Sequence, residues 1–233
     1  MQRRIEISSE NWKKYCYAVG DYNPIHWNTK MAQSFGLEGK IAPGMFIASH
    51  IQGGRNITGA RIKFSGSVYD GDSLVVDEVG DGGYIFKRGD DVVCEVKGVK
   101  EDDFDLMAPK LFSDNEVLHR YFSSVCESNV GVFLGSLGIE GGDNLYGMYL
   151  ASLSGPALLD FGKKNGFVGI HASQTFTAYR DVEPGFVDVL IGGLRERGPL
   201  QSYELQWINR RVRGDSGVIA SGRAFVLPLK KGE

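Results

Sequence analysis

One short segment of the chain combines an acid, an imidazole and a rigid turn. Segment 20–26 reads GDYNPIH, so that Asp21 and His26 lie on either side of Asn23 and Pro24. Pro24 has a restricted φ and forces Asn23 into an extended or turn conformation. The two ionisable side chains can therefore point to one spot. A carboxylate and an imidazole that converge on one water molecule form an acid/base pair, because imidazole exchanges its proton close to neutrality.

The complete string is more specific than its parts. A lone Asp or His is most often a turn cap or a satisfied surface group, and Asn-Pro is a common turn dipeptide. A turn does not require an acid before Asn23 and a histidine after Pro24. The string therefore favours a functional role for Asp21 and His26 over a purely structural one.

The elements around this segment are predicted to be helices. Residues 9–19 follow a helical period, with Ser9 as the expected cap and Gly20 as the expected stop. Asn28 is expected to cap a short helix that runs to about Phe35.

A third helix is predicted over 45–53, opened by Pro43-Gly44. Its apolar residues do not keep to one stripe, so it should be buried nearly all round. Beyond Gly59 the period changes to two, and Gly-Asp and Gly-Gly turns separate short apolar runs. The expected strands are 61–64, 68–69, 74–76, 84–86 and 92–96.

The same order returns in the second half of the chain. Residues 101–112 read as a linker, and a helix is predicted over 112–125, with Ser113 as its cap and Glu116 at the capping-box position. A second helix is predicted over 151–162. Further strands are expected at 168–179, 186–194, 201–209 and 217–227.

A shift of about 112 residues places the second half on the first. It lays Phe64 on Phe176 and Gly44 on Pro156. The sequence thus predicts an α+β fold with an internal duplication, each half a sheet around an apolar helix. The expected domains are residues 1–100 and residues 113–233, joined by a linker at 101–112.

Composition excludes several classes of function. The chain has 233 residues, 42% of them hydrophobic and 24% charged, so it can form a large core without disulfides. Its net charge of −3 gives no basic field that would attract nucleic acid or anionic lipid. No apolar run approaches the roughly 20 residues of a membrane span, and no signal peptide is expected.

Cysteine and histidine usage points to a cytoplasmic protein without a metal site. Cys16, Cys94 and Cys126 are odd in number and widely spaced, which favours reduced thiols. His and Cys never cluster at the spacing of metal ligands, so no metal is expected. No dinucleotide fingerprint, phosphate-binding loop or nucleophile elbow is present, and no cofactor is expected.

Segment 20–26, with Ala32 shortly after it, resembles the signature of the MaoC-like family. That family includes the R-specific enoyl-CoA hydratases, called hydratase 2, and related 3-hydroxyacyl-thioester dehydratases. The similarity extends over roughly residues 12–100 and includes Phe35-Gly36, segment 41–45 and the stretch from Phe64 to Asp72. The resemblance implies the hotdog fold, here as a tandem or double hotdog whose two halves are curved antiparallel sheets around a long central helix.

The resemblance also implies a role for each matching residue. Asp21 and His26 would be the catalytic dyad, and Asn23 would support the turn. The backbone N–H of Gly44 would bind the thioester carbonyl oxygen, a role that suits free N–H donors at a helix start. The expected substrate contacts are Asn23, Pro43, Met45 and Phe46. For Phe46, core packing is the alternative.

Two departures from the family pattern affect the same site. Val19 stands where the family usually has a small residue, and Pro43 stands where it often has histidine. The second half lacks the motif, since Gly142-Asp143-Asn144 is followed by no proline and histidine in register. His171, on a predicted strand, is expected to be an ordinary surface or core histidine. The second half would then be catalytically silent and shape the acyl tunnel, as the resemblance implies.

A weaker signal is the arginine group Arg210, Arg211 and Arg213 at a likely hairpin end. These residues could meet the phosphates of coenzyme A or a phosphopantetheine arm, although a solvated turn is the simpler interpretation.

The sequence therefore predicts a hydro-lyase of fatty acid metabolism. The expected reaction is reversible hydration of trans-2-enoyl thioesters, or dehydration of R-3-hydroxyacyl thioesters, on coenzyme A or acyl carrier protein. Two alternatives remain, an acyl-thioester hydrolase of the same fold and a non-catalytic acyl-binding module. The expected partner is the acyl thioester, and a homodimer of such chains is compatible with the fold.

Overall fold

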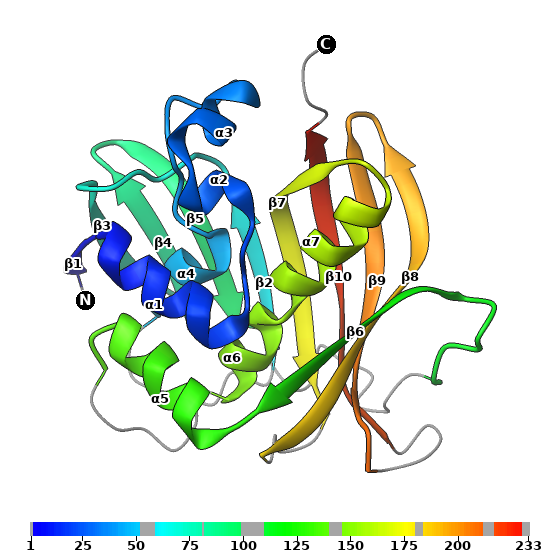
Figure 1. Ribbon diagram of the computed structural model, residues 1–233. Coiled ribbons are helices and arrows are strands. Elements are labelled where there is room, and N and C mark those ends of the chain that lie inside the picture. The colour runs from blue at the N-terminus through cyan, green and yellow to red at the C-terminus, as the bar shows by residue number, and fades with distance from the viewer. Residues whose placement is uncertain are drawn as a thin grey trace.

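The computed structural model describes most of the chain (Figure 1). The described residues are 2–51, 59–80, 82–98, 110–139, 146–179, 184–211 and 217–229. The predicted linker lies outside them up to residue 109, as do residues 142–144 and Arg213.

Within the described ranges, ten strands form one antiparallel sheet, in the order β1-β3-β4-β5-β2-β7-β10-β9-β8-β6. The strands are β1 (Gln2–Glu6), β2 (Gly59–Phe64), β3 (Ser73–Val79), β4 (Gly83–Arg88), β5 (Asp91–Gly98), β6 (Val117–Val125), β7 (Val168–Ala178), β8 (Gly185–Arg197), β9 (Leu200–Asn209) and β10 (Val218–Leu229). Most of the predicted strands are present, but Val68–Tyr69 contributes only an isolated bridge between Tyr69 and Ile41. The strand β1 was not predicted.

The helices lie in front of the curved sheet in the view of Figure 1. They are α1 (Ser9–Val19), α2 (Pro24–Trp27), α3 (Thr29–Ser34), α4 (Gly44–Ala48), α5 (Glu127–Ser136), α6 (Tyr146–Ser152) and α7 (Ser154–Lys164). Among the described residues, none of these helices combines the length and the apolar character that crossing a membrane requires.

The two halves of the sheet repeat one topology. Each half runs strand, helices, then four strands, and the spatial orders β1-β3-β4-β5-β2 and β6-β8-β9-β10-β7 correspond strand by strand. The halves join where β2 pairs with β7, from Gly59 opposite Thr177 to Lys63 opposite Ser173. Ile62 pairs with Gln174 in the middle of this junction, and these two residues are related by the same shift of about 112 that aligns the halves. An approximate twofold axis therefore passes through this pair.

Helix α1 agrees with its prediction. Trp12, Tyr15 and Cys16 are fully buried on one face, where the ring of Tyr15 packs against Phe46 of α4 and Phe133 of α5. The capping residue is Ser8 and not Ser9, and its side chain accepts a hydrogen bond from the N–H of Glu10. Gly20 ends the helix with a φ of 80°, a left-handed conformation that glycine adopts without strain.

The central helices are shorter than predicted. In the first half α4 spans only Gly44–Ala48, and the chain continues as a turn through His50. Its buried face is apolar over all of Met45–Ala48, as expected for a helix without a polar stripe. In the second half the predicted helix 151–162 is divided between α6 and α7 by a break at Leu153.

The prediction of a helix over 112–125 is wrong, because most of this segment is the strand β6. The expected contact does form, because the N–H and Oγ of Ser113 donate to Oε2 of Glu116 at 2.8 and 2.7 Å. The contact closes a turn, however, and the chain then enters β6, which pairs with β8 from Val117 to Val125. Cross-strand pairing of this valine- and aromatic-containing run outweighs the local capping signal. The following helix α5 was not predicted.

Candidate active site

The loop between α1 and α3 is built by local backbone interactions. The N–H groups of Gly20 and Asp21 both donate to the carbonyl of Cys16, at 2.8 and 2.9 Å. Asn23 then caps α2 by accepting the N–H of Ile25, and Pro24 is the first residue of that helix. Because the missing N–H of proline has no partner at this position in any helix, the turn is tight without loss of a hydrogen bond.

This loop brings Asp21 and His26 together. Asp21 Oδ2 lies 3.8 Å from His26 Nε2, and both side chains are less than a tenth exposed. Asp21 Oδ1 accepts the N–H of Asn23 at 3.1 Å, which leaves Oδ2 turned toward the imidazole. The convergence inferred from the spacing is therefore present.

The imidazole of His26 is held in one orientation. Its Nδ1 lies 2.8 Å from the carbonyl oxygen of Ile41, which can only accept a hydrogen bond, so Nδ1 carries the proton. Burial lowers the pKa of His26, while the Asp21 carboxylate and the Ile41 carbonyl raise it by less. The ring is thus neutral near pH 7, with the lone pair of Nε2 on the side of Asp21.

Two hydrogen-bond acceptors therefore face one another without a proton between them. A separation of 3.8 Å is too long for a direct hydrogen bond. A water molecule or a hydroxyl group has the protons that both atoms lack. This arrangement can hold a water molecule, take a proton from it, and return a proton to a bound ligand.

The loop is braced against the rest of the fold. Asn23 Nδ2 donates to the carbonyl of Gly169 on β7 at 3.1 Å, which ties the loop to the second half. This contact is the support that the sequence analysis assigned to Asn23.

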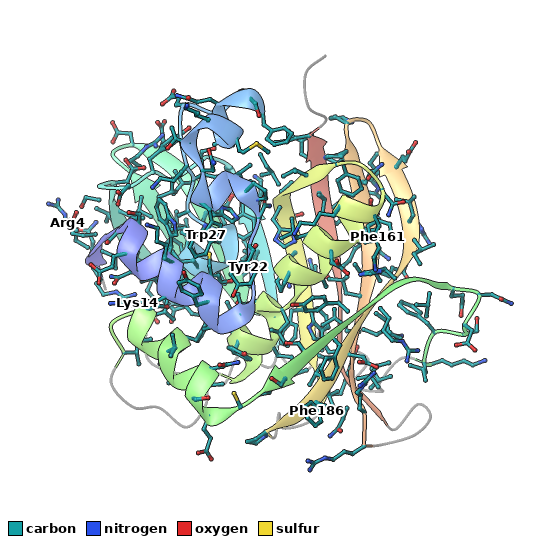
Figure 2. The ribbon with its side chains drawn as sticks, in the orientation of Figure 1. Arg4, Lys14, Tyr22, Trp27, Phe161 and Phe186 are labelled. Atoms are coloured by element: carbon teal, nitrogen blue, oxygen red, sulfur yellow. The ribbon has the colours of Figure 1, made fainter. Side chains whose placement is uncertain are left out.

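Two tryptophans also hold the loop. Trp27 Nε1 donates to the carbonyl of Asp21 at 3.1 Å, and Trp12 Nε1 donates to the carbonyl of His26 at 3.3 Å. On the outer side of the loop, Tyr22 and Trp27 lie together with ring centroids 5.9 Å apart (Figure 2).

Asp21 and His26 open onto a cavity of about 380 Å³. This volume is in the range of small-molecule sites, roughly 300–1,000 Å³. The wall is largely apolar, and no Lys or Arg belongs to it among the described residues. It is formed by both halves, with Ile25, Ile41, Pro43, Gly44, Met45, Phe64 and Val68 from the first and Gly155, Leu158, Gly169, Ile170, His171, Val226 and Leu227 from the second.

Gly44, the first residue of α4, forms part of the cavity wall together with Pro43 and Met45. A Cβ at Gly44 would lie 2.9 Å from the ring of Phe64, so a larger residue there would require this ring to move. Phe46 is different, because it is buried in the core against Tyr15 and outside the cavity wall. Core packing, the alternative considered for Phe46, is the role that its position indicates.

The start of α7 meets the Asp21 carboxylate. A Cβ on Gly155, the second residue of α7, would lie 3.1 Å from Asp21 Oδ2. The carboxylate therefore lies against the N-terminal turn of an 11-residue helix, where a negative charge is favoured. Sequence reasoning missed Gly155, since only the packing of the two halves brings it to Asp21.

His171 lies in the cavity wall, not at the surface or in the core as expected from sequence. A β-bulge at Ala172 is responsible: Ser173 pairs with Phe225, and His171 pairs with the next residue, Val226. Val226 faces the interior, so His171 faces it too. Ala172 also lines the cavity, and without the bulge, alternation from the buried Gln174 would leave Ala172 on this face and turn His171 to the other.

The arginines near 210 lie elsewhere. Arg210 Nε contacts Asp188 Oδ1 at 2.8 Å, and its guanidinium lies 4.5 Å from the ring centroid of Phe122. Neither Arg210 nor Arg211 belongs to the cavity wall. Their contact with substrate phosphates stays a prediction.

Comparison with known proteins gives the family. Residues 1–102 match the family described as the MaoC like domain. This part of the chain is a MaoC-like domain. The family that segment 20–26 indicated is thereby confirmed. No curated protein matches the chain at a significant level.

Solved structures show that the MaoC-like fold extends over the whole chain. A MaoC domain protein dehydratase from Chloroflexus aurantiacus is 14% identical, with a TM-score of 0.62, covering 100% of this chain and 95% of that one. Peroxisomal multifunctional enzyme type 2 from Drosophila melanogaster is 12% identical, with a TM-score of 0.58, covering 98% of this chain and 48% of that one. A thioesterase II from Thermobifida fusca is 9% identical, with a TM-score of 0.53, covering 97% of this chain and 92% of that one. This chain therefore shares with these proteins a mixed α/β fold that has one large antiparallel sheet and few helices.

Proposed function

We propose that this MaoC-like protein catalyses the reversible hydration of trans-2-enoyl thioesters, with Asp21 and His26 as the dyad. The observation that carries the proposal is the pair of buried acceptors, Asp21 Oδ2 and His26 Nε2, 3.8 Å apart at the wall of an apolar cavity. A water molecule between them would donate one proton to each, which leaves its oxygen lone pair free for attack on a ligand.

The proposed reaction balances without a further reactant. The water oxygen forms a bond to C3 of the enoyl group, one O–H bond breaks, and the C2–C3 π electrons move into the thioester as an enolate. The dyad accepts the proton and delivers a proton to C2, so the product is a 3-hydroxyacyl thioester. The two groups act as one coupled pair in this transfer. Addition of water moves no electrons to a carrier, so neither a redox cofactor nor a metal is required.

Gly44 is proposed to stabilise the enolate. The first N–H groups of a helix have no partner within the helix, and Gly44 begins α4 at the cavity wall. A backbone N–H directed at an oxygen that becomes negative in the transition state lowers the barrier. Pro43 and Met45 would contact the acyl thioester on either side.

The fold is proposed to be a double hotdog with unequal halves. The repeated strand order and the β2–β7 junction support two hotdogs in one chain, divided at the predicted linker. The half up to residue 100 would carry the dyad. The half from residue 113 would close the acyl pocket, since Gly155, Leu158 and His171 form part of its wall.

Thioester hydrolysis is the second candidate. The fold of the Thermobifida fusca protein named a thioesterase II supports it, and an activated water could attack the thioester carbonyl instead of C3. A covalent route through Cys94 is disfavoured. Cys94 belongs to the cavity wall, but burial raises its pKa, so that it stays a thiol rather than a nucleophilic thiolate.

The test is hydration of crotonyl-CoA, followed by loss of the enoyl absorbance, with a thiol reagent in parallel. We expect hydration without thiol release, and a fall of about 10²- to 10⁴-fold in Asp21→Asn. Asp90→Asn, at an exposed turn between β4 and β5, is the matched control and should retain full activity. Equal rates in wild type and Asp21→Asn would remove the dyad from the reaction. Thiol release without hydration would favour the hydrolase, and binding without turnover would favour a non-catalytic module.

A further inference from the structure

His171 gives the cavity a polar group that the hydration chemistry does not use. Its Nε2 is buried and has no hydrogen-bond partner among the described residues. The β-bulge at Ala172 turns this side chain inward, and its cross-strand neighbour Val226 is apolar. Bulges commonly re-aim a side chain next to a functional site.

The imidazole is uncharged. Burial lowers the pKa of His171 to about 4, with Asp21 opposing this effect and His26 adding to it. Both dyad members are therefore near enough to affect His171 electrostatically. A neutral imidazole offers either an N–H or a lone pair at Nε2, and a hydroxyl group can complement both.

We propose that His171 binds a hydroxyl group on the acyl part of the substrate, so that the preferred substrates are enoyl thioesters with a hydroxyl substituent beyond the double bond. This inference rests on the proposed function and narrows it. Nε2 is already covered and unpaired without a ligand, and an unsubstituted alkyl chain in the cavity would leave it unpaired. A hydroxyl group would restore the missing hydrogen bond, an advantage of about 10- to 100-fold in affinity.

The charge of the cavity argues against a carboxylate at this position. Asp21 already provides a negative charge, and the described part of the wall contains no Lys or Arg that could neutralise a second one. Burial of an unpaired carboxylate beside another is strongly unfavourable. An uncharged oxygen substituent is the group that this surface suits.

The test measures binding of saturated thioesters, which cannot be hydrated. Calorimetry would compare 4-hydroxybutyryl-CoA with butyryl-CoA and 5-hydroxypentanoyl-CoA with pentanoyl-CoA. We expect wild type to bind the hydroxylated member of at least one pair 10- to 100-fold more tightly. His171→Phe should reduce that ratio to about one, and His171→Asn, which keeps a hydrogen-bonding group, should retain part of it.

His119→Asn is the matched control, because His119 contacts Asp160 at 2.9 Å outside the cavity wall and should leave the ratio unchanged. If His171→Phe does not fold, His171→Leu takes its place. The inference is overturned if wild type shows no preference in either pair, or if the preference survives in the Phe or Leu variant. Since binding is measured without turnover, a chain that hydrates neither crotonyl-CoA nor 4-hydroxycrotonyl-CoA but shows the expected ratios would refute the proposed function and leave the role of His171 standing.

Discussion

The starts of α4 and α7 occupy corresponding positions in the two halves but meet different groups. In the first half, Gly44 packs against the ring of Phe64 and forms part of the cavity wall. In the second half, the N-terminal turn of α7 is covered by the Asp21 carboxylate, which comes from the first half. The shift of about 112 residues places Pro43 on Gly155 and Gly44 on Pro156, so that the two dipeptides are reversed.

This difference indicates how the two halves would divide the proposed reaction between them. One helix start borders the cavity, and its counterpart contacts the carboxylate that is proposed to act there. The halves share a strand order, yet the proposed dyad belongs to the first half, and Gly155, which contacts Asp21, belongs to the second. Changes at the two positions should therefore affect activity in different ways.

The largest effect is expected from His26→Gln. This substitution removes the imidazole Nε2 that faces Asp21, so crotonyl-CoA hydration should fall by about 10²- to 10⁴-fold. The control is His119→Gln, whose histidine lies outside the cavity wall, and it should keep at least half the wild-type rate.

The pH dependence of hydration gives a second test of the role of His26. The pKa of His26 is lowered by burial, so its neutral form persists to a lower pH than that of an exposed histidine. The acidic limb of the kcat/KM profile should therefore have its midpoint below the ordinary value of about 6.5. A midpoint above 6.5 would contradict the neutral, Nδ1-protonated imidazole described here.

A smaller effect is expected from Gly155→Ala. The new Cβ would lie 3.1 Å from Asp21 Oδ2, so the carboxylate would have to shift by a few tenths of an ångström, which changes its position relative to His26. A misplacement of 1 Å can reduce a rate by about 10²-fold, and for this smaller shift we expect a fall of roughly 3- to 10-fold in kcat. The melting temperature should change little. An unchanged kcat in a folded Gly155→Ala variant would show that α7 does not position Asp21.

The smallest effect is expected from Gly135→Ala, in the exposed face of α5. A Cβ at Gly135 meets no atom within 4 Å, so nothing there requires glycine. Alanine should raise the free energy of unfolding by about 0.5–1 kcal/mol through the lower entropy of the unfolded chain. Denaturant unfolding measures this change, and hydration activity should stay at the wild-type level. A loss of stability would mean that α5 has a constraint at this position beyond helix propensity.

Sequence predicted the parts of the site that depend on neighbouring residues. The geometry of Asp21 and His26 follows from Gly20, Asn23 and Pro24, which act within seven positions of the chain. The helix stop and the Asn-Pro cap need no distant partner, so their signals can be recognised in a single sequence. The general order of strands was predicted for the same reason, since glycine-containing turns mark it.

The parts that depend on distant contacts were missed. His171 faces the cavity only because β7 contains a bulge opposite β10, and alternation along β7 alone would direct it outward. Gly155 contacts the carboxylate of Asp21, which lies 134 positions earlier in the chain. The segment 117–125 contains a plausible helical pattern, and its pairing with β8 decides otherwise. A histidine within the otherwise apolar and small run VGIHA was the one available signal for His171.

The central claim is that Asp21 and His26 act together on one water molecule. The most direct measurement is a double-mutant cycle of crotonyl-CoA hydration with Asp21→Asn, His26→Gln and the variant that carries both. If the two groups work as a unit, the double variant should be no more than about tenfold slower than the slower single variant. Losses that multiply in the double variant, or a single variant as fast as wild type, would contradict the account.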